Sequence, residues 1–275
     1  MSIELINIWY IVAAALFIFG LKRLGSPATA VRGNMFSSLG MLIAIAVTLF
    51  NAQILTYEWI LGAAIIGGII GYVAAEKVAM TSMPEMVALF NGSGGIASLF
   101  VGWAALYNLG NSTFTDITIV LSILIGGLTF TGSILAWGKL SEVMTSRAIV
   151  FGAQRIFNAA LLIALVVCSV MFVLEPSSES PYLYAIIALS FLFGVMAVLP
   201  IGGADMPVVI SLLNSLTGIA AAMGGFIYQN QAMILGGIFV GAAGMILTLL
   251  MCKAMNRSLI NVIIGAFGGG GAGID

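Results

Sequence analysis

Residues 117–138 read ITIVLSILIGGLTFTGSILAWG, an apolar run that carries no charged side chain between Asp116 and Lys139. A transmembrane helix needs about 20 consecutive, mostly apolar residues to cross the hydrocarbon core of a bilayer. This run is therefore long enough to cross a membrane as a single helix. A soluble protein would expose too much apolar surface if it contained many such runs.

The same kind of run recurs along the whole chain. Of its 275 residues 61% are hydrophobic and only 7% are charged, whereas about a quarter of the residues of a soluble domain are charged. The sequence therefore predicts an all-α integral membrane protein, a bundle of about nine transmembrane helices. The apolar runs occupy residues 3–21, 35–50, 59–75, 85–107, 117–138, 156–174, 182–199, 207–228 and 232–252.

The charged residues predict the orientation of these spans. Cytoplasmic loops of membrane proteins carry an excess of Lys and Arg. With nine spans, every basic residue falls on one side of the membrane, and the charged residues on the other side are all acidic. We therefore expect the N-terminus outside and the C-terminus in the cytoplasm. The basic residues are Lys22, Arg23, Arg32, Lys77, Lys139, Arg147, Arg155, Lys253 and Arg257, and the acidic ones opposite are Glu4, Glu58, Asp116, Glu175 and Glu179.

Two parts follow from the composition: a transmembrane domain at residues 1–257 and a glycine-rich cytoplasmic tail at 258–275. The tail contains the spacing G-x-G-x-x-G at Gly268, Gly270 and Gly273. A dinucleotide site also needs a strand before this motif and a helix after it. We therefore interpret the tail as a flexible linker toward a further domain, and we expect no cofactor on this chain.

Other composition features exclude whole classes of site. The formal net charge is −1 and there is no basic run, so a nucleic-acid partner is not expected. Histidine, the commonest metal ligand and proton shuttle, is absent. We therefore predict no metal site. Cys168 and Cys252 fall near opposite faces of the bilayer, too far apart for a disulfide.

Polar side chains lie inside several predicted spans. Asn91 and Asn214 both lie about 10 Å from the cytoplasmic start of their helices, at 1.5 Å per residue, and Ser133 falls close to the same level. Ser211, Asn214 and Ser215 share one helical face with Gly218. An unsatisfied amide is costly in hydrocarbon, so these groups should face one another or water. They could be simple contacts between helices or part of a polar pathway.

Small residues form stripes at helix-packing spacing, which favours close approach of neighbouring helices. The stripes are Gly67 with Gly71, Gly237 with Gly241, and Asn91, Gly95, Ser98 and Gly102.

The connector 200–207, PIGGADMP, places Asp205 just before a helix that begins near Pro207. An acid at this position commonly caps the helix and is stabilised by the helix dipole. No basic residue lies in the connector, so contact with a partner surface and proton entry are alternative roles.

Four segments carry a resemblance to a known family: IGGADMPVVISLLNS (201–215), MCKAMNRSLINVI (251–263), KVAMTSMPEMVAL (77–89) and FTGSILAWGKL (130–140). They closely resemble the membrane domain of the β subunit of proton-translocating NAD(P) transhydrogenase. The similarity runs from the first span to the tail. It implies nine spans with the N-terminus outside, in the bacterial cytoplasmic (inner) membrane.

The resemblance also implies function and partners. Hydride would pass from NADH to NADP⁺ in soluble domains that bind NAD and NADP, while this membrane part conducts protons inward. The hydride-transfer site itself would not be on this chain. Expected partners are an α-type subunit with membrane helices and an NAD-binding domain, an NADP-binding domain, and a second protomer in a homodimer.

Site residues carry over one at a time. Many family members have a histidine, thought to bind the translocated proton, where this chain has Asn91. Asn214 matches an asparagine of the family's proton pathway, Asp205 the acid that faces the NADP-binding domain, and Arg257 a basic residue near the linker. Because Asn91 cannot titrate, the proton-binding group would lie elsewhere, for example on a histidine of the partner. The rival interpretation is a stand-alone ion-coupled secondary transporter, but the chain shows no half-to-half repeat of the kind such folds have.

Overall fold

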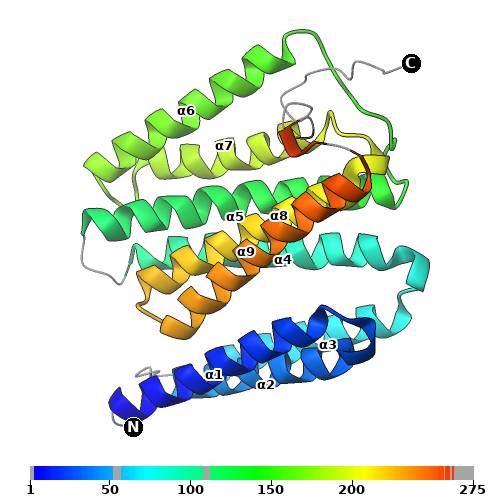
Figure 1. The fold of residues 1–275 in the computed structure, drawn as a ribbon. Helices are drawn as coiled ribbons and strands as arrows, with labels where there is room; N and C mark the ends of the chain where they lie inside the picture. The colour runs from blue at the N-terminus through cyan, green and yellow to red at the C-terminus, as the bar shows by residue number, and fades with distance from the viewer. Residues whose placement is uncertain (1–2, 52–56, 108–111, 257, 261, 263–275) are drawn as a thin grey trace. The chain divides into compact units, whose positions relative to one another are not determined.

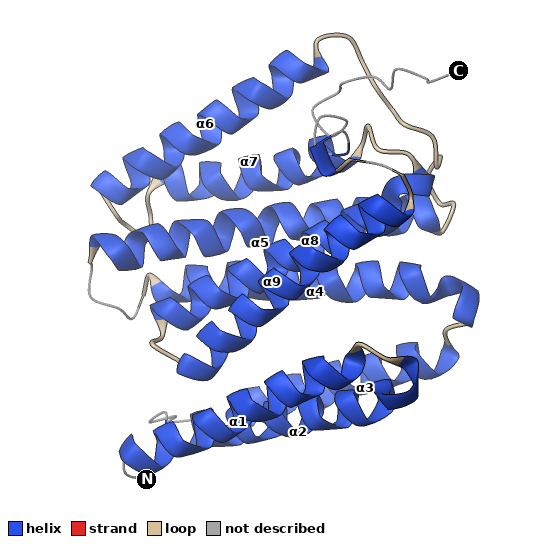
Figure 2. Ribbon diagram, viewed as in Figure 1, coloured by secondary structure: helices blue, strands red, loops and turns tan. Residues whose placement is uncertain are grey.

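The computed structural model describes residues 3–51, 57–107, 112–256, 258–260 and 262. Within these residues nine helices are long and apolar enough to cross a membrane (Figures 1 and 2). The prediction of an all-helical multi-pass membrane protein is therefore confirmed. The helices are α1 (Ile3–Leu24), α2 (Pro27–Asn51), α3 (Glu58–Lys77), α4 (Met83–Ala105), α5 (Thr113–Leu140), α6 (Gln154–Leu174), α7 (Pro181–Val198), α8 (Met206–Ile227) and α9 (Gln231–Ala254), with short 3₁₀ turns at Met80–Ser82 and Gly203–Asp205.

Helix α2 is the clearest difference from the predicted spans, because it begins at Pro27 rather than at residue 35. Proline is favoured in the first turn of a helix, where its missing N–H is not needed. The polar first turns are also packed against α1. A Cβ added to Gly33 would lie 2.8 Å from the backbone oxygen of Gly20. The helix therefore extends beyond its apolar run because contact with α1 stabilises its polar start.

The chain divides into two compact units. The first comprises residues 1–77 and 230–236. In it, α1 and α2 form an antiparallel pair, and the Tyr10 and Thr48 hydroxyls lie 2.9 Å apart. The Asn230 amide donates to both of them, at 3.3 and 3.1 Å. Helix α3 has no buried residue, and a Cβ on Gly67 would meet no described atom within 4 Å.

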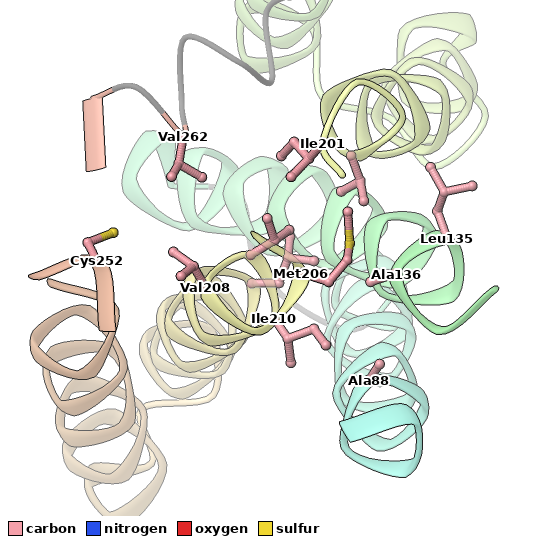
Figure 3. Packing of buried hydrophobic residues seen from close by; sticks show 12 residues of the cluster. Ala88, Leu135, Ala136, Ile201, Met206, Val208, Ile210, Cys252 and Val262 are labelled. Atoms are coloured by element: carbon pink, nitrogen blue, oxygen red, sulfur yellow. The ribbon is translucent and has the colours of Figure 1, made fainter. Parts of the chain in front are cut away.

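The second unit comprises residues 78–229 and 237–275. Its central helix is α5, which lies against α4, α6, α7 and α8 (Figure 1). At the end where α5 finishes and α8 begins, a buried apolar cluster joins α4, α5 and α8. Figure 3 shows Met206, Ala136 and Ile201 within this cluster. These packed helices place the polar residues described below at fixed positions.

Glycines allow two helix pairs of this unit to approach closely. A Cβ on Gly95 of α4 would lie 2.8 Å from the backbone oxygen of Gly126 on α5. A Cβ on Gly218 of α8 would lie 2.5 Å from the backbone nitrogen of Gly241 on α9, and Gly237 meets the backbone of Ala222 as closely. Two of the three predicted stripes are therefore packing surfaces. The stripe at Gly67 and Gly71 packs on nothing within the described part of the chain.

Candidate functional site

A buried polar cluster connects three helices of the second unit. The Asn91 amide nitrogen on α4 donates to Ser133 Oγ on α5 at 2.9 Å. The Asn91 amide oxygen accepts from Thr217 Oγ1 on α8, also at 2.9 Å. Asn91 is 8% exposed and Ser133 is fully buried. The Asn91 side chain therefore links α4 to α5 through its amide nitrogen and to α8 through its amide oxygen.

The sequence around Asn91 makes this geometry possible. A Cβ on the neighbouring Gly92 would lie 3.3 Å from Ser133 Cβ, and one on Gly94 would lie 3.1 Å from Thr217 Cγ2. Larger residues at either position would press α4 away from α5 or α8. The short amide of Asn91 reaches both hydroxyls because glycines let the three backbones come close.

Asn214 does not join this cluster. Its side chain is exposed, and it makes no hydrogen bond to Asn91 or Ser133 among the described residues. Thr217, almost one turn further along α8, occupies the position beside Asn91. Ser211 and Ser215 turn toward α9, where they donate to the backbone oxygens of Gly244 and Gly241. Counting residues from the helix start gave the depth of Asn214, but it did not give the direction in which the side chain points.

Polar groups continue along the contact between α4 and α5. Ser122 Oγ donates to the backbone oxygen of Ser98 at 2.8 Å, in a buried position. Between Ser122 and Ser133 lies Thr129, whose fully buried hydroxyl has no hydrogen-bond partner among the described residues. Buried hydroxyls nearly always have a partner. The contact between α4 and α5 therefore contains more polar groups than an ordinary apolar contact between membrane helices.

These side chains are neutral throughout the physiological pH range. An amide or a hydroxyl can donate and accept hydrogen bonds, but it does not bind a proton as a charged group at neutral pH. The cluster can therefore stabilise a proton in transit or orient water, but it cannot store the charge. No group of three or more His, Cys, Asp and Glu residues that could hold a metal ion occurs in the described part of the chain.

Asp205 lies at the last position of the 3₁₀ turn Gly203–Asp205, immediately before α8. It occupies the N-cap position, but its side chain makes no capping hydrogen bond to that helix. Its location therefore matches the prediction, whereas the capping role is not seen. Arg257, the other residue expected to contact an NADP-binding domain, lies outside the described residues.

The sequence interpretation missed buried polar residues at the same end of the unit. Lys139 in the last turn of α5 is fully buried, although it resembled an ordinary basic marker of a span end. Gln154 and Asn158 on α6 are also buried, and the Asn158 amide donates to the backbone oxygen of Met196 at 3.4 Å. No spacing signal distinguishes a buried lysine from an exposed one at the end of an apolar run.

Comparison with known proteins identifies the family. The family model described as "NAD(P) transhydrogenase beta subunit" matches residues 6–274. Two Rhodospirillum rubrum proteins, both named NAD(P) transhydrogenase subunit beta, are 42% identical over 271 residues. The match covers 95% of this chain, and the chain spans 58% of the length of these relatives.

The family match covers α1 from residue 6 onward and the whole of α2 to α9, including α4, α5 and α8, which carry the polar cluster. It also covers Asp205 and the connectors at that end of the unit. This chain is a multi-pass membrane protein that belongs to the NAD(P) transhydrogenase β-subunit family.

Proposed function

We propose that this chain is the proton-conducting membrane part of an NAD(P) transhydrogenase. In this role it couples hydride transfer from NADH to NADP⁺ with inward movement of protons. The family match supports the class of enzyme. The observation that carries the proposed route is the Asn91 amide, which is bonded on one side to Ser133 and on the other to Thr217.

A proton route needs polar groups where a bare charge would be costly. Asn91, Ser133 and Thr217 supply such groups between α4, α5 and α8. The buried Thr129 hydroxyl, one turn from Ser133, would gain a partner if water entered this contact during transport. Asn214 is exposed on α8, where a membrane helix of a partner subunit could reach it. Because the chain has no histidine, we place the titrating group on such a partner.

The nucleotides belong to other parts of the complete enzyme in this proposal. NAD would bind to an α-type subunit, and NADP would bind to a domain that follows the glycine-rich residues 258–275. Asp205 and Arg257 would face that domain on the cytoplasmic side. The segregation of basic residues supports this orientation, with the N-terminus outside, in a bacterial inner membrane. A pair of protomers completes the proposed assembly.

Such coupling requires that NADP(H) occupancy and proton access change each other's free energy. The test is therefore a comparison of the chain alone with the complete complex, each reconstituted in vesicles. We expect proton uptake only in the complete complex and only while both nucleotides turn over. Proton or solute transport by the chain alone, independent of nucleotides, would instead indicate a stand-alone secondary transporter.

Asn214 provides a second arm of this experiment. Because its side chain is exposed, Asn214→Ala should leave folding unchanged but reduce pumping by the complex several-fold. Ala221→Ser, a change at a half-buried position further along α8, serves as the matched control. Normal pumping by Asn214→Ala at every pH tested would remove Asn214 from the route.

A further inference from the structure

Lys139 is a buried basic residue whose hydrogen-bond partners, among the residues that the structure describes, are all backbone carbonyl groups. Its Nζ donates to the oxygens of Leu199 at 2.5 Å and Ile201 at 2.7 Å. The oxygens of Val198 and Arg147 lie at 3.5 Å. An ammonium group has three donors and no acceptor, so backbone carbonyls are suitable partners for it. Most of them lie at the C-terminal end of α7, where the helix dipole also favours a cation.

This side chain connects two loops that are far apart in the sequence. We call residues 141–153 connector A and residues 199–205 connector B. Besides the bonds of Lys139 to both, the backbone N–H of Gly203 donates to the oxygen of Ser146 at 2.7 Å. The N–H of Ile149 donates to the oxygen of Leu199 at 3.2 Å. The connectors are therefore bonded to each other as well as to the end of α5.

Connector A also adopts an unfavourable backbone conformation near each of its ends. Glu142 has φ 59° and Ala153 has φ 66°, values that side-chain-bearing residues rarely adopt. Such conformations persist only where the surrounding contacts stabilise them. Ser146 Oγ supplies one of these contacts by donating to the backbone oxygen of Lys139 at 2.9 Å. The geometry of connector A thus depends on its bonds around Lys139.

Lys139 lies on the helix that carries part of the polar cluster and is bonded to the connector that contains Asp205. Ser133, a partner of Asn91, lies on the same rigid helix about 9 Å away at 1.5 Å per residue. Connector B ends at Asp205. Exposed lysines at the ends of other spans, Lys77 and Lys253, have no comparable burial. Lys139 is therefore the basic side chain that joins the helix of the polar cluster to the connector of Asp205.

We propose that Lys139 is a positioning residue for coupling. Its ammonium group holds connectors A and B in one fixed arrangement at the end of α5, so that Asp205 keeps a defined position relative to Asn91 and Ser133. This inference rests on the proposed function. Lys139 itself neither carries the proton nor contacts a nucleotide.

The experiment uses the complete complex in vesicles and measures protons moved per hydride transferred. Lys139→Met keeps the length of the side chain and removes its donors, whereas Lys139→Gln keeps a donor. Lys77→Met removes the same charge from an exposed span end and is the matched control. We expect the ratio to fall at least tenfold in Lys139→Met, less in Lys139→Gln, and not at all in Lys77→Met.

A disulfide between connectors A and B distinguishes a positioning role of Lys139 from a role of its charge in transport. A Cβ on Gly203 would lie 3.0 Å from Ser146 Cβ, so a small opening suffices for a disulfide, which needs about 3.5–4.5 Å. Ser146→Cys with Gly203→Cys should therefore join connectors A and B on oxidation. Cys168 and Cys252 are free cysteines and are replaced by alanine in every variant.

The reference for this test is the oxidised double-cysteine variant with Lys139 intact, because Ser146→Cys removes the bond from Ser146 Oγ to the Lys139 backbone oxygen. If Lys139 acts by positioning, oxidation should restore coupled pumping in Lys139→Met to within about threefold of this reference, and reduction should abolish the rescue. An assembled Lys139→Met enzyme that pumps normally, or one that the disulfide does not rescue, would overturn the proposal. Failure of rescue would indicate that the charge itself takes part in transport.

Hydrogen exchange provides a readout that does not depend on proton pumping. Lys139→Met should speed exchange at the amides of Gly203 and Ile149, and Lys77→Met should not. Unchanged exchange at both amides would contradict the positioning role even in an active enzyme. If the wild-type complex does not pump, the proposed function is wrong. Faster exchange in Lys139→Met would then still support the role of Lys139 in holding connectors A and B together.

Discussion

Asn91 of α4 and Thr217 of α8 are 126 residues apart in the chain, and the Thr217 hydroxyl donates to the Asn91 amide oxygen at 2.9 Å. The same hydroxyl lies 3.1 Å from the backbone oxygen of Leu213 on its own helix. Because the nitrogen of the same amide donates to Ser133 Oγ, the two contacts together fix the orientation of the amide. The arrangement makes Thr217 the residue that tests whether that orientation matters.

Thr217→Val should therefore lower proton pumping by the complete enzyme about tenfold, because the isosteric side chain cannot donate to Asn91. Thr217→Ser keeps the hydroxyl and should retain at least a third of wild-type pumping. Initial rates of proton uptake in vesicles check both variants. Equal pumping by the valine and serine variants would mean that the hydrogen bond plays no part in transport.

Packing between α4 and α5 gives a prediction about stability. A Cβ on Gly95 would lie 2.8 Å from the backbone oxygen of Gly126 and 2.9 Å from the backbone nitrogen of Phe130. Neither atom can move without the helix, so Gly95→Ala should destabilise the fold by about 1–3 kcal/mol. Thermal unfolding in detergent measures the effect.

The matched control is Gly67→Ala on α3, where an added Cβ meets no described atom within 4 Å. Alanine has the higher helix propensity, so this variant should be neutral or slightly stabilising, by up to about 1 kcal/mol. Comparable destabilisation of the two variants would show that the contact between α4 and α5 is not the cause.

Replacing Asp205 should affect proton pumping without affecting the stability of the fold. Asp205→Asn keeps the size and shape of the side chain, so it should leave the unfolding temperature close to that of the wild type. If the carboxylate couples the membrane part to the NADP-binding domain, pumping should fall at least tenfold, equivalent to about 1.4 kcal/mol. Glu142→Gln, an exposed carboxylate in connector A, is the control for loss of charge. Wild-type pumping by Asp205→Asn would remove it from the coupling site.

The orientation in the membrane is tested with reporter fusions. The segregation of all nine basic residues predicts a cytoplasmic signal from a reporter fused after Arg257. A reporter inserted at residues 177–180, between α6 and α7, should lie outside. A cytoplasmic signal from that second position would contradict the proposed orientation.

The sequence was sufficient to predict the helices because apolar runs report directly on membrane spans. It also predicted that Asn91 and Ser133 lie at one level, and the structure brings them into contact. It did not reveal Thr217, because depth along a helix says nothing about the direction of a side chain around it. Lys139 was missed for another reason: burial of a charged group depends on the carbonyls of a distant connector. Both omissions concern contacts between segments far apart in the chain.

The central claim is that the amide of Asn91 lies on the proton route. The most direct measurement is the number of protons moved per hydride transferred by the complete enzyme carrying Asn91→Leu. Leucine has the same branched arrangement of four side-chain heavy atoms as asparagine but cannot form either hydrogen bond. Ser93→Ala is the control, since its exposed hydroxyl bonds only to the backbone oxygen of Leu89 among the described residues. The account predicts at least a tenfold lower ratio for Asn91→Leu and a wild-type ratio for Ser93→Ala. A wild-type ratio for an assembled Asn91→Leu enzyme would contradict it.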